Sequence, residues 1–120
     1  MERVTGIGGF FFRSANPAET AAWYRQHLGI DLVPQDYNTP PWQQEAGPTV
    51  FAPFPNSTEF FGRDEQTWII NFRVPDLEAM VQQLQAAGIK VEVDPQEYPN
   101  GSFAQLQDPE GNPIQLWSPK

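Results

Sequence analysis

The sequence predicts an α+β fold made of two repeated units, each with a strand, a helix and then three more strands. Two segments carry clear helix start and stop signals, and short aromatic or β-branched segments bounded by turns surround them. The halves also resemble each other, because residues 10–30 (FFFRSANPAETAAWYRQHLGI) align with residues 70–89 (INFRVPDLEAMVQQLQAAGI) once a single deletion is allowed. Such a unit cannot bury its sheet alone, so residues 1–63 and 64–120 must share one core as a single domain.

The first unit begins with a strand at Thr5–Arg13, which ends in phenylalanines. In the helix that follows, Asn16 is the N-cap, Pro17 takes the first helical position, and Glu19 completes a capping box. Gly29 ends this helix, because glycine readily adopts the left-handed conformation found there. The rest of the unit is predicted as strands at 30–33, 49–54 and 57–61, with a long loop at 34–48.

The second unit repeats this order, starting with a strand at Trp68–Val74 and a helix capped by Asp76. The apolar residues of this helix, at positions 77, 80, 81 and 84, form one stripe, and Gly88 ends it. A strand at 89–93 follows, in which valines alternate with charged residues.

The last two predicted strands, at 102–107 and 113–117, form a hairpin around Asp108–Asn112. Pro109 favours the second position of a type I turn, and Gly111 supplies the positive φ that closes the turn.

The composition argues against several classes of partner. Fifteen acidic residues against seven basic ones give a net charge of −8, which disfavours binding to nucleic acids and anionic membranes. Cysteine is absent, so there is no disulfide framework, thiolate metal site or cysteine nucleophile. The sequence shows no signal-peptide pattern and no apolar run that could span a bilayer. We therefore expect a soluble, cytoplasmic protein without nucleic-acid or membrane partners.

Three motifs resemble those of a known family. WYRQHLGI ends the first helix, NFRVPDLEA opens the second unit, and DPEGNPIQLW closes it. Together with the repeat, they resemble the vicinal oxygen chelate superfamily, which contains glyoxalase I, bleomycin-resistance proteins, extradiol dioxygenases and fosfomycin-resistance enzymes. The resemblance implies that the two βαβββ units form an open, curved, mixed-sheet barrel around a cleft, usually in a homodimer.

The resemblance also indicates where metal-dependent members carry their ligands. Those positions correspond to Gly9, Ile69 and Gln115, and more loosely to Glu59 late in the first unit. Glycine and isoleucine offer no side-chain ligand, and a neutral amide is a weak partner for a transition metal. The single histidine, His27, lies at a helix end, where it interacts favourably with the helix dipole. We therefore expect neither a metal nor another cofactor.

The cleft is predicted to present aromatic rings and amides to an organic molecule. Gln115 faces the cleft by the family alignment, and Trp117 shares its side of the strand. Trp68 and Trp117 are equally compatible with ordinary core or dimer contacts. Seven residues are predicted to line the cleft: Trp42, Trp68, Asn71, Phe103, Gln105, Gln115 and Trp117.

Arg13 and Arg73 occupy equivalent positions in the two halves. An anionic ligand is one partner for these side chains, but nearby carboxylates and carbonyl groups near the helix starts are the expected partners.

Two functions remain open from the sequence. The first is a metal-independent, homodimeric binding protein that holds a small, partly aromatic molecule, the functional type implied by the bleomycin-resistance proteins. The second is a lyase or isomerase acting on a small oxygenated substrate, with or without a divalent metal, for which Glu59 is a weak candidate base. The fold alone does not decide between them, because one scaffold hosts many functions.

Overall fold

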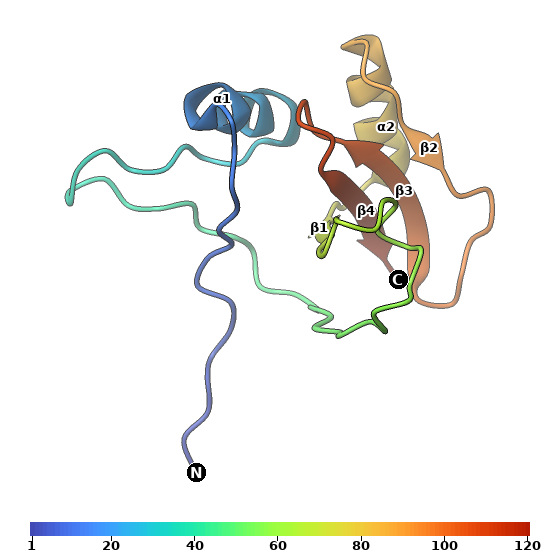
Figure 1. The fold of residues 1–120 in the computed structure, drawn as a ribbon, viewed down its shortest axis with the longest axis horizontal. Helices are drawn as coiled ribbons and strands as arrows, with labels where there is room; N and C mark the ends of the chain where they lie inside the picture. The colour runs from blue at the N-terminus through green and yellow to red at the C-terminus, as the bar shows by residue number, and fades with distance from the viewer.

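The regular elements of the protein lie mostly in its second half (Figure 1), in a computed structural model that describes residues 1–120. The strands form one open four-stranded sheet of order β1-β4-β3-β2, in which β1 and β4 are parallel and the other neighbours are antiparallel. The predicted α+β class and the mixed sheet are confirmed. Neither helix is long and apolar enough to cross a membrane. In chain order the elements are α1 (Pro17–Leu28), β1 (Ile70–Arg73), α2 (Leu77–Ala86), β2 (Glu92–Val93), β3 (Gly101–Gln107) and β4 (Pro113–Pro119).

The core lies between α2 and one face of the sheet. Asp76 caps α2 as predicted, because its Oδ1 accepts a hydrogen bond from the Ala79 N–H at 3.0 Å. The apolar stripe of α2 is confirmed by the burial of Leu77, Val81 and Leu84. Successive residues of a strand point to opposite faces, so the even-numbered side chains of β3 and β4 face the core. The buried ones are Ala104, Leu106, Ile114 and Leu116.

α1 begins and ends at the predicted residues. The Asn16 Oδ1 accepts a hydrogen bond from the Glu19 N–H at 3.2 Å, and Gly29 adopts the left-handed conformation with φ 75°. The predicted capping box is only half formed, because the Asn16 N–H donates to Ser14 Oγ and not to the Glu19 side chain. The Ser14 hydroxyl thus accepts the Asn16 N–H, which in a complete capping box would donate to the Glu19 carboxylate.

A buried hydrogen bond fastens α1 to the turn between β3 and β4. Tyr24 Oη donates to Asp108 Oδ2 at 2.7 Å, which joins the two halves of the chain. Burial raises the pKa of Tyr24 far above its ordinary value, and the hydrogen bond to Asp108 raises this pKa further. Asp108 also accepts hydrogen bonds from the N–H groups of Glu110 and Asn112 and from the Asn112 amide. The predicted turn is confirmed, with Gly111 at φ 81°.

The first-half segments that were predicted as strands do not form strands. Residues 5–13, 30–33, 49–54 and 57–61 lie outside every strand of the structure. A strand requires a hydrogen-bonded neighbour, and residues 1–15 and 31–54 make no backbone–backbone hydrogen bond. The predicted pairing of two complete βαβββ units in a barrel is therefore not formed by the isolated chain, whose sheet stays open. The predicted strands at 68–74 and 89–93 are shorter than expected, at Ile70–Arg73 and Glu92–Val93.

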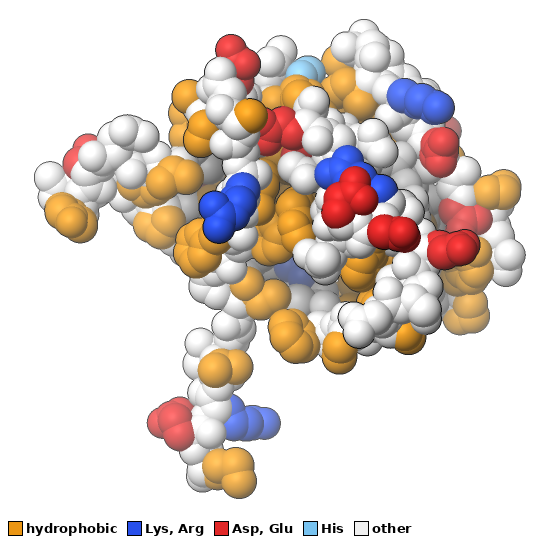
Figure 2. Space-filling view, in the orientation of Figure 1, with side chains coloured by type: hydrophobic (Ala, Val, Ile, Leu, Met, Phe, Trp, Pro, Cys, Tyr) orange, Lys and Arg blue, Asp and Glu red, His pale blue; other side chains and the backbone are white.

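These unpaired segments carry apolar side chains at the surface. Figure 2 shows hydrophobic side chains along the extended N-terminal segment and along the loop that projects on the left. Phe11 is 94% exposed, Phe51 88% and Val50 74%. A compact monomer of 13.6 kDa exposes about 6,600 Å², whereas this chain exposes 9502 Å². The first half therefore leaves surface uncovered that a compact domain would bury.

Candidate functional site

The sheet face opposite α2 carries the odd-numbered side chains of β1, β3 and β4 and, through the pairing of β2 with β3, the even-numbered side chain of Glu92. The strand register arranges these side chains in two rows across the sheet. One row is polar, and the next contains two stacked aromatic rings. Asp94 belongs to the second row, because its N–H donates to the Phe103 carbonyl at 3.0 Å. The first row holds Asn71, Gln115, Gln105 and Glu92, and the second holds Arg73, Trp117, Phe103 and Asp94.

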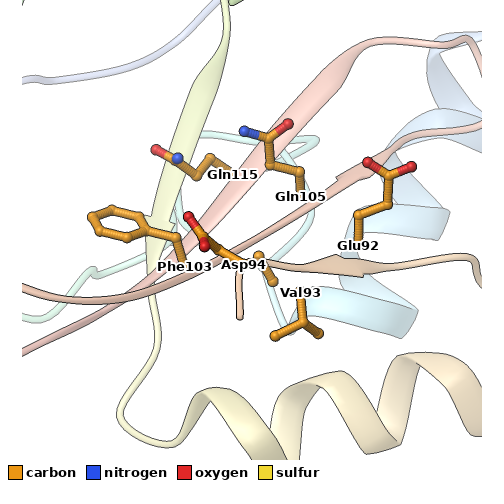
Figure 3. A pocket seen from close by; sticks show the side chains of 7 residues that line it. Glu92, Val93, Asp94, Phe103, Gln105 and Gln115 are labelled. Atoms are coloured by element: carbon orange, nitrogen blue, oxygen red, sulfur yellow. The ribbon is translucent and has the colours of Figure 1, made fainter. Parts of the chain in front are cut away.

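A cavity of about 260 Å³ opens on this face, over β2, β3 and β4. Figure 3 shows the side chains of Gln105, Gln115 and Glu92 rising on the same side of the sheet, away from the helix below. Ligand pockets usually measure about 300–1,000 Å³, so this open cavity forms one wall of a site and does not enclose a ligand. Its lining consists of Glu92, Val93, Asp94, Phe103, Ala104, Gln105 and Gln115.

The polar row presents amide groups to this cavity. Asn71 Nδ2 donates to Gln115 Oε1 at 2.8 Å, which orients the Gln115 amide across the parallel pair β1 and β4. The Gln115 Nε2 and the whole Gln105 amide form no hydrogen bond with the protein and remain available as donors and acceptors. Three of the predicted residues, Asn71, Gln105 and Gln115, therefore form one continuous polar row.

The aromatic row supports the cavity from one side. Phe103 and Trp117 stack with ring centroids 6.2 Å apart and an interplanar angle of 3°. Trp117 is only 8% exposed, and its Nε1 donates to the Asn100 carbonyl at 2.9 Å. A Cβ at Gly101 would overlap the Ser118 carbonyl oxygen, so only glycine allows this close approach of β3 and β4. Phe103 is the aromatic side chain that reaches the cavity, and Trp117 holds it in place.

Two carboxylates also line the cavity, and the sequence analysis did not select them. Asp94 accepts hydrogen bonds from the Gln96 N–H at 3.0 Å and from the Tyr98 hydroxyl at 2.9 Å. The bond to Asp94 raises the pKa of Tyr98. Glu92 is exposed and lies 3.9 Å from the Lys90 ammonium. The alternation of charged residues with valines in the predicted 89–93 strand is the signal that could have found Glu92, and Asp94 follows at the next alternating position.

Of the predicted residues, only Phe103, Gln105 and Gln115 line the cavity, and Asn71 and Trp117 contact this lining from beside it. The remaining predicted residues, Trp42, Trp68 and Glu59, lie away from the cavity. Trp68 packs on Phe10 and Phe12, with ring centroids 5.0 and 5.5 Å apart. Trp42 is 40% exposed on the long loop. Glu59 is exposed, and its backbone carbonyl accepts a turn hydrogen bond from the Gly62 N–H. Sequence alone could not place these side chains, because their positions depend on contacts between segments far apart in the chain.

A metal site of the family type requires several donor side chains that converge on one point. No group of three or more His, Cys, Asp or Glu side chains is placed to hold a metal ion. Of the three aligned ligand positions, only Gln115 has a polar side chain, and its Oε1 already accepts the Asn71 hydrogen bond. The residues present therefore do not fit the metal centre of the metal-dependent members.

A second hollow, of about 410 Å³, lies between α1 and the β3–β4 turn. It is lined by α1 residues, among them Glu19 and Trp23, and by Pro109 and Glu110 of the turn. The Glu110 carboxylate accepts a hydrogen bond from the Ala15 N–H at 2.8 Å, so it is engaged in joining the two halves. None of the predicted cleft residues lies in this hollow.

The chain belongs to the glyoxalase-like domain family, whose family model matches residues 9–117. This match confirms the predicted membership of the vicinal oxygen chelate superfamily. No curated protein matches the chain.

Three solved structures share the fold. TnmS3, an antibiotic binding protein from Streptomyces sp. CB03234, is 20% identical with a TM-score of 0.65, and the match covers 100% of both chains. A glyoxylase/bleomycin resistance protein/dioxygenase domain from Frankia sp. EAN1pec is 18% identical with a TM-score of 0.59, covering 98% of this chain and 100% of that one. A putative glyoxalase family protein from Bacillus anthracis is 18% identical with a TM-score of 0.54, covering 86% and 84%. At these identities the likeness concerns the fold alone.

Proposed function

We propose that this protein binds a small, partly aromatic organic molecule on the open face of its sheet, without a metal and without altering the molecule. The observation that carries the proposal is the row of amides formed by Asn71, Gln115 and Gln105 beside the ring of Phe103. Amides supply hydrogen bonds that fix orientation, and an aromatic ring supplies stacking, which are the two components of a typical organic ligand site.

The comparison structures support a binding role. TnmS3 is an antibiotic binding protein with the same fold over its full length. Only the general role of binding carries over to this chain, because the ligand depends on the side chains of the site and not on the fold.

A thermal-shift screen with planar aromatic antibiotics and small oxo-acids tests the proposal. A ligand that binds only the folded state raises the Tm, so we expect at least one planar aromatic compound to raise it by several degrees. The affinity of that compound is then measured by calorimetry for Gln115→Leu, which we expect to bind roughly tenfold more weakly. Gln107→Leu is the matched control, since Gln107 is exposed on the same hairpin and outside the cavity. Equal weakening by both variants, or no binder in the panel, would contradict the proposal.

The enzyme alternative rests on a carboxylate base. Glu59 does not line the cavity, whereas Glu92 and Asp94 do. Asp94 is engaged by two hydrogen bonds, and Glu92 is solvent-exposed, so neither is prepared for proton abstraction by burial. Turnover of any oxo-acid in the screen, lost in Glu92→Gln, would establish the alternative and overturn the binding role.

We further propose that the protein functions as a homodimer. The exposed surface exceeds that of a compact monomer by roughly 2,900 Å², and the radius of gyration of 15.4 Å exceeds the value of about 13.5 Å for a chain of this length. A standard interface covers only about 800 Å² per partner. The excess exposed surface of this chain is larger than that, so a second copy can be accommodated on it. The segments around Phe11 and Phe51 contain no charged residue between Val4 and Phe12 or between Ala46 and Thr58, so the net charge does not oppose contact there.

Sedimentation velocity at micromolar concentration tests the homodimer. We expect the wild type to sediment as a dimer and Phe51→Asp to sediment as a monomer, because a buried carboxylate without a partner destabilises an interface. A monomeric wild type would refute the proposed dimer and leave the binding test unaffected. The predicted cytoplasmic location stays a prediction.

A further inference from the structure

Arg73 lies at the end of β1, on the same sheet face as the candidate site, and its guanidinium binds the long loop of the first half. Its Nη2 donates to the Glu45 carbonyl at 2.6 Å. Its Nη1 donates to the Pro48 carbonyl at 2.7 Å and to the Thr49 hydroxyl at 3.0 Å. The predicted carbonyl partners are therefore present, although they come from the loop and not from a helix start. All three partners are neutral oxygens.

These are the only hydrogen bonds that join residues 31–54 to the rest of the chain. The backbone of this stretch makes no backbone–backbone hydrogen bond, and its remaining side-chain hydrogen bonds are local. The repeat-equivalent Arg13 is exposed and has no comparable contacts. All hydrogen bonds between the loop and the rest of the chain therefore come from one guanidinium group.

Gly47 fits against the same guanidinium. A Cβ at Gly47 would lie 2.8 Å from Arg73 Nε and 3.0 Å from Arg73 Cζ. Such distances force one partner to move, and the flexible end of the arginine is the part that can move. The contact can therefore be weakened from either side, by shortening the donor or by adding a methyl group to the loop.

We infer that Arg73 is a positioning residue that holds the segment Glu45–Thr49 against the sheet at β1 and so shapes one side of the candidate site. In the second row of the sheet face, Arg73 lies opposite Trp117, which stacks on Phe103 of the cavity. The segment therefore borders the face on which the ligand of the proposed function would lie. Its role in ligand binding rests on that proposed function, whereas the anchoring itself does not.

Limited proteolysis with a glutamate-specific protease tests the anchoring directly. The Glu45–Ala46 peptide bond contains the carbonyl that Arg73 binds, so release of the segment exposes a defined cleavage site. Glu59–Phe60 is the internal reference, because Glu59 is exposed and is not among the hydrogen-bond partners of Arg73. For Arg73→Met we expect cleavage at Glu45 to be roughly tenfold faster, with cleavage at Glu59 unchanged. Arg73→Lys, which keeps a donor, should restore part of the protection.

Two matched controls accompany these variants. Arg13→Met removes the equivalent arginine of the first half and should leave both cleavage rates unchanged. Gly47→Ala should accelerate cleavage at Glu45, whereas Gly8→Ala, at a glycine with open space around it, should not. Synthetic peptides of residues 40–53 with and without the Gly47 change correct for any effect on the protease itself. Gly47→Ala also keeps the test decisive if Arg73→Met fails to fold.

The outcomes separate anchoring from general stability and from ligand binding. Equal acceleration at Glu45 and Glu59, or acceleration at neither, would overturn the inference. The planar probe 9-aminoacridine supplies a second measurement, and we expect its affinity for Arg73→Met to fall severalfold relative to Arg13→Met. Loss of protection at Glu45 without any change in that affinity would overturn the link to the site and leave the anchor standing. If the wild type does not bind the probe at all but protection of the Glu45 cleavage site still depends on Arg73, the proposed function is contradicted and the anchoring is not.

Discussion

The two halves of the chain share one sequence pattern, but only the second half pairs its strands. In the second half all strands lie in one sheet, and the three largest fully buried side chains, Leu84, Ile114 and Leu116, belong to it. The first half forms its helix and leaves its other predicted strands without hydrogen-bonded neighbours. The difference shows that a strand pattern becomes a strand only where an edge is available to pair with.

The comparison also explains where the candidate site lies. The paired half supplies a rigid face on which register places Asn71, Gln105 and Gln115 in one row. The unpaired half supplies a loop that one guanidinium holds in place. The candidate site therefore combines a face fixed by strand pairing with a loop that one side chain attaches, and the following substitutions compare the two halves.

The largest expected effect is in the core of the paired half. Leu84 is 0% exposed, so Leu84→Ala should lower the free energy of unfolding by about 3 kcal/mol through lost burial and a cavity. The matched change in the unpaired half, Leu32→Ala, should lower it by less than about 1 kcal/mol, because Leu32 is already 44% exposed. Urea unfolding measures both. Similar losses would show that the halves are packed alike, contrary to the structure.

A somewhat smaller effect is expected at the link between the halves. Asp108→Ala removes the acceptor of the Tyr24 hydroxyl and of three further donors, and should lower the free energy of unfolding by about 2 kcal/mol. Asp36→Ala is the control, since Asp36 accepts two backbone hydrogen bonds on the exposed loop and should matter far less. Thermal unfolding measures both variants. If Asp108→Ala and wild type have the same melting temperature, α1 is held to the second half by packing and not by this hydrogen bond.

Tyr24→Phe should have a smaller effect, with a pH dependence of defined sign. Loss of the hydroxyl should lower the free energy of unfolding by about 1 kcal/mol at neutral pH, because Asp108 keeps its other donors. The pKa of Tyr24 is raised by folding from 10.0, so its protonated form stabilises the fold fully below pH 10.0, and this contribution is lost as the pH rises above that value. Urea unfolding between about pH 7 and pH 11 should therefore show a steeper alkaline decline for wild type than for Tyr24→Phe.

Tyr98→Phe is the control for this pH series. The pKa of Tyr98 is also raised, by its hydrogen bond to Asp94, but Tyr98 does not join the two halves. If Tyr24→Phe and wild type lose stability in parallel across the alkaline range, the buried Tyr24 hydroxyl is not the group that titrates.

The smallest expected effect is on metal binding. Gln115→Glu supplies the carboxylate of the family position, but Gly9 and Ile69 still provide no companion ligand. Calorimetric titration with nickel, zinc and manganese should therefore detect no stoichiometric site in wild type or variant. One metal ion per chain bound by the wild type at micromolar affinity would refute the metal-independent proposal.

Local signals in the sequence predicted local structure well. Asn16 and Asp76 cap the two helices, Gly29 ends the first, and Gly111 closes the hairpin turn, all as predicted. Each of these depends on contacts within a few residues, so the sequence contains everything needed to predict it. The predicted capping box at Glu19 was wrong in one of its two hydrogen bonds. Ser14, two residues before the cap, accepts the Asn16 N–H in place of the Glu19 side chain.

The site was predictable in part. Alternation along the last strand placed Gln115 and Trp117 on one face, and the structure shows that face next to Gln105 and Phe103. The sequence could not predict which residues of neighbouring strands lie opposite each other, because register depends on pairing between distant segments. Trp42 and Trp68 were assigned to the same cleft from their aromatic character, and the structure places them outside the cavity lining.

By itself, the sequence determined the α+β class, the helix limits, the hairpin turn and the family, because these follow from local propensity and recognisable motifs. Only the tertiary structure decided which strands are paired, which carboxylates stand beside the amides, and that Arg73 holds the loop of the other half. These contacts join residues far apart in the chain. Their geometry is set by the hydrogen-bond register of the sheet and by packing, which no single segment encodes.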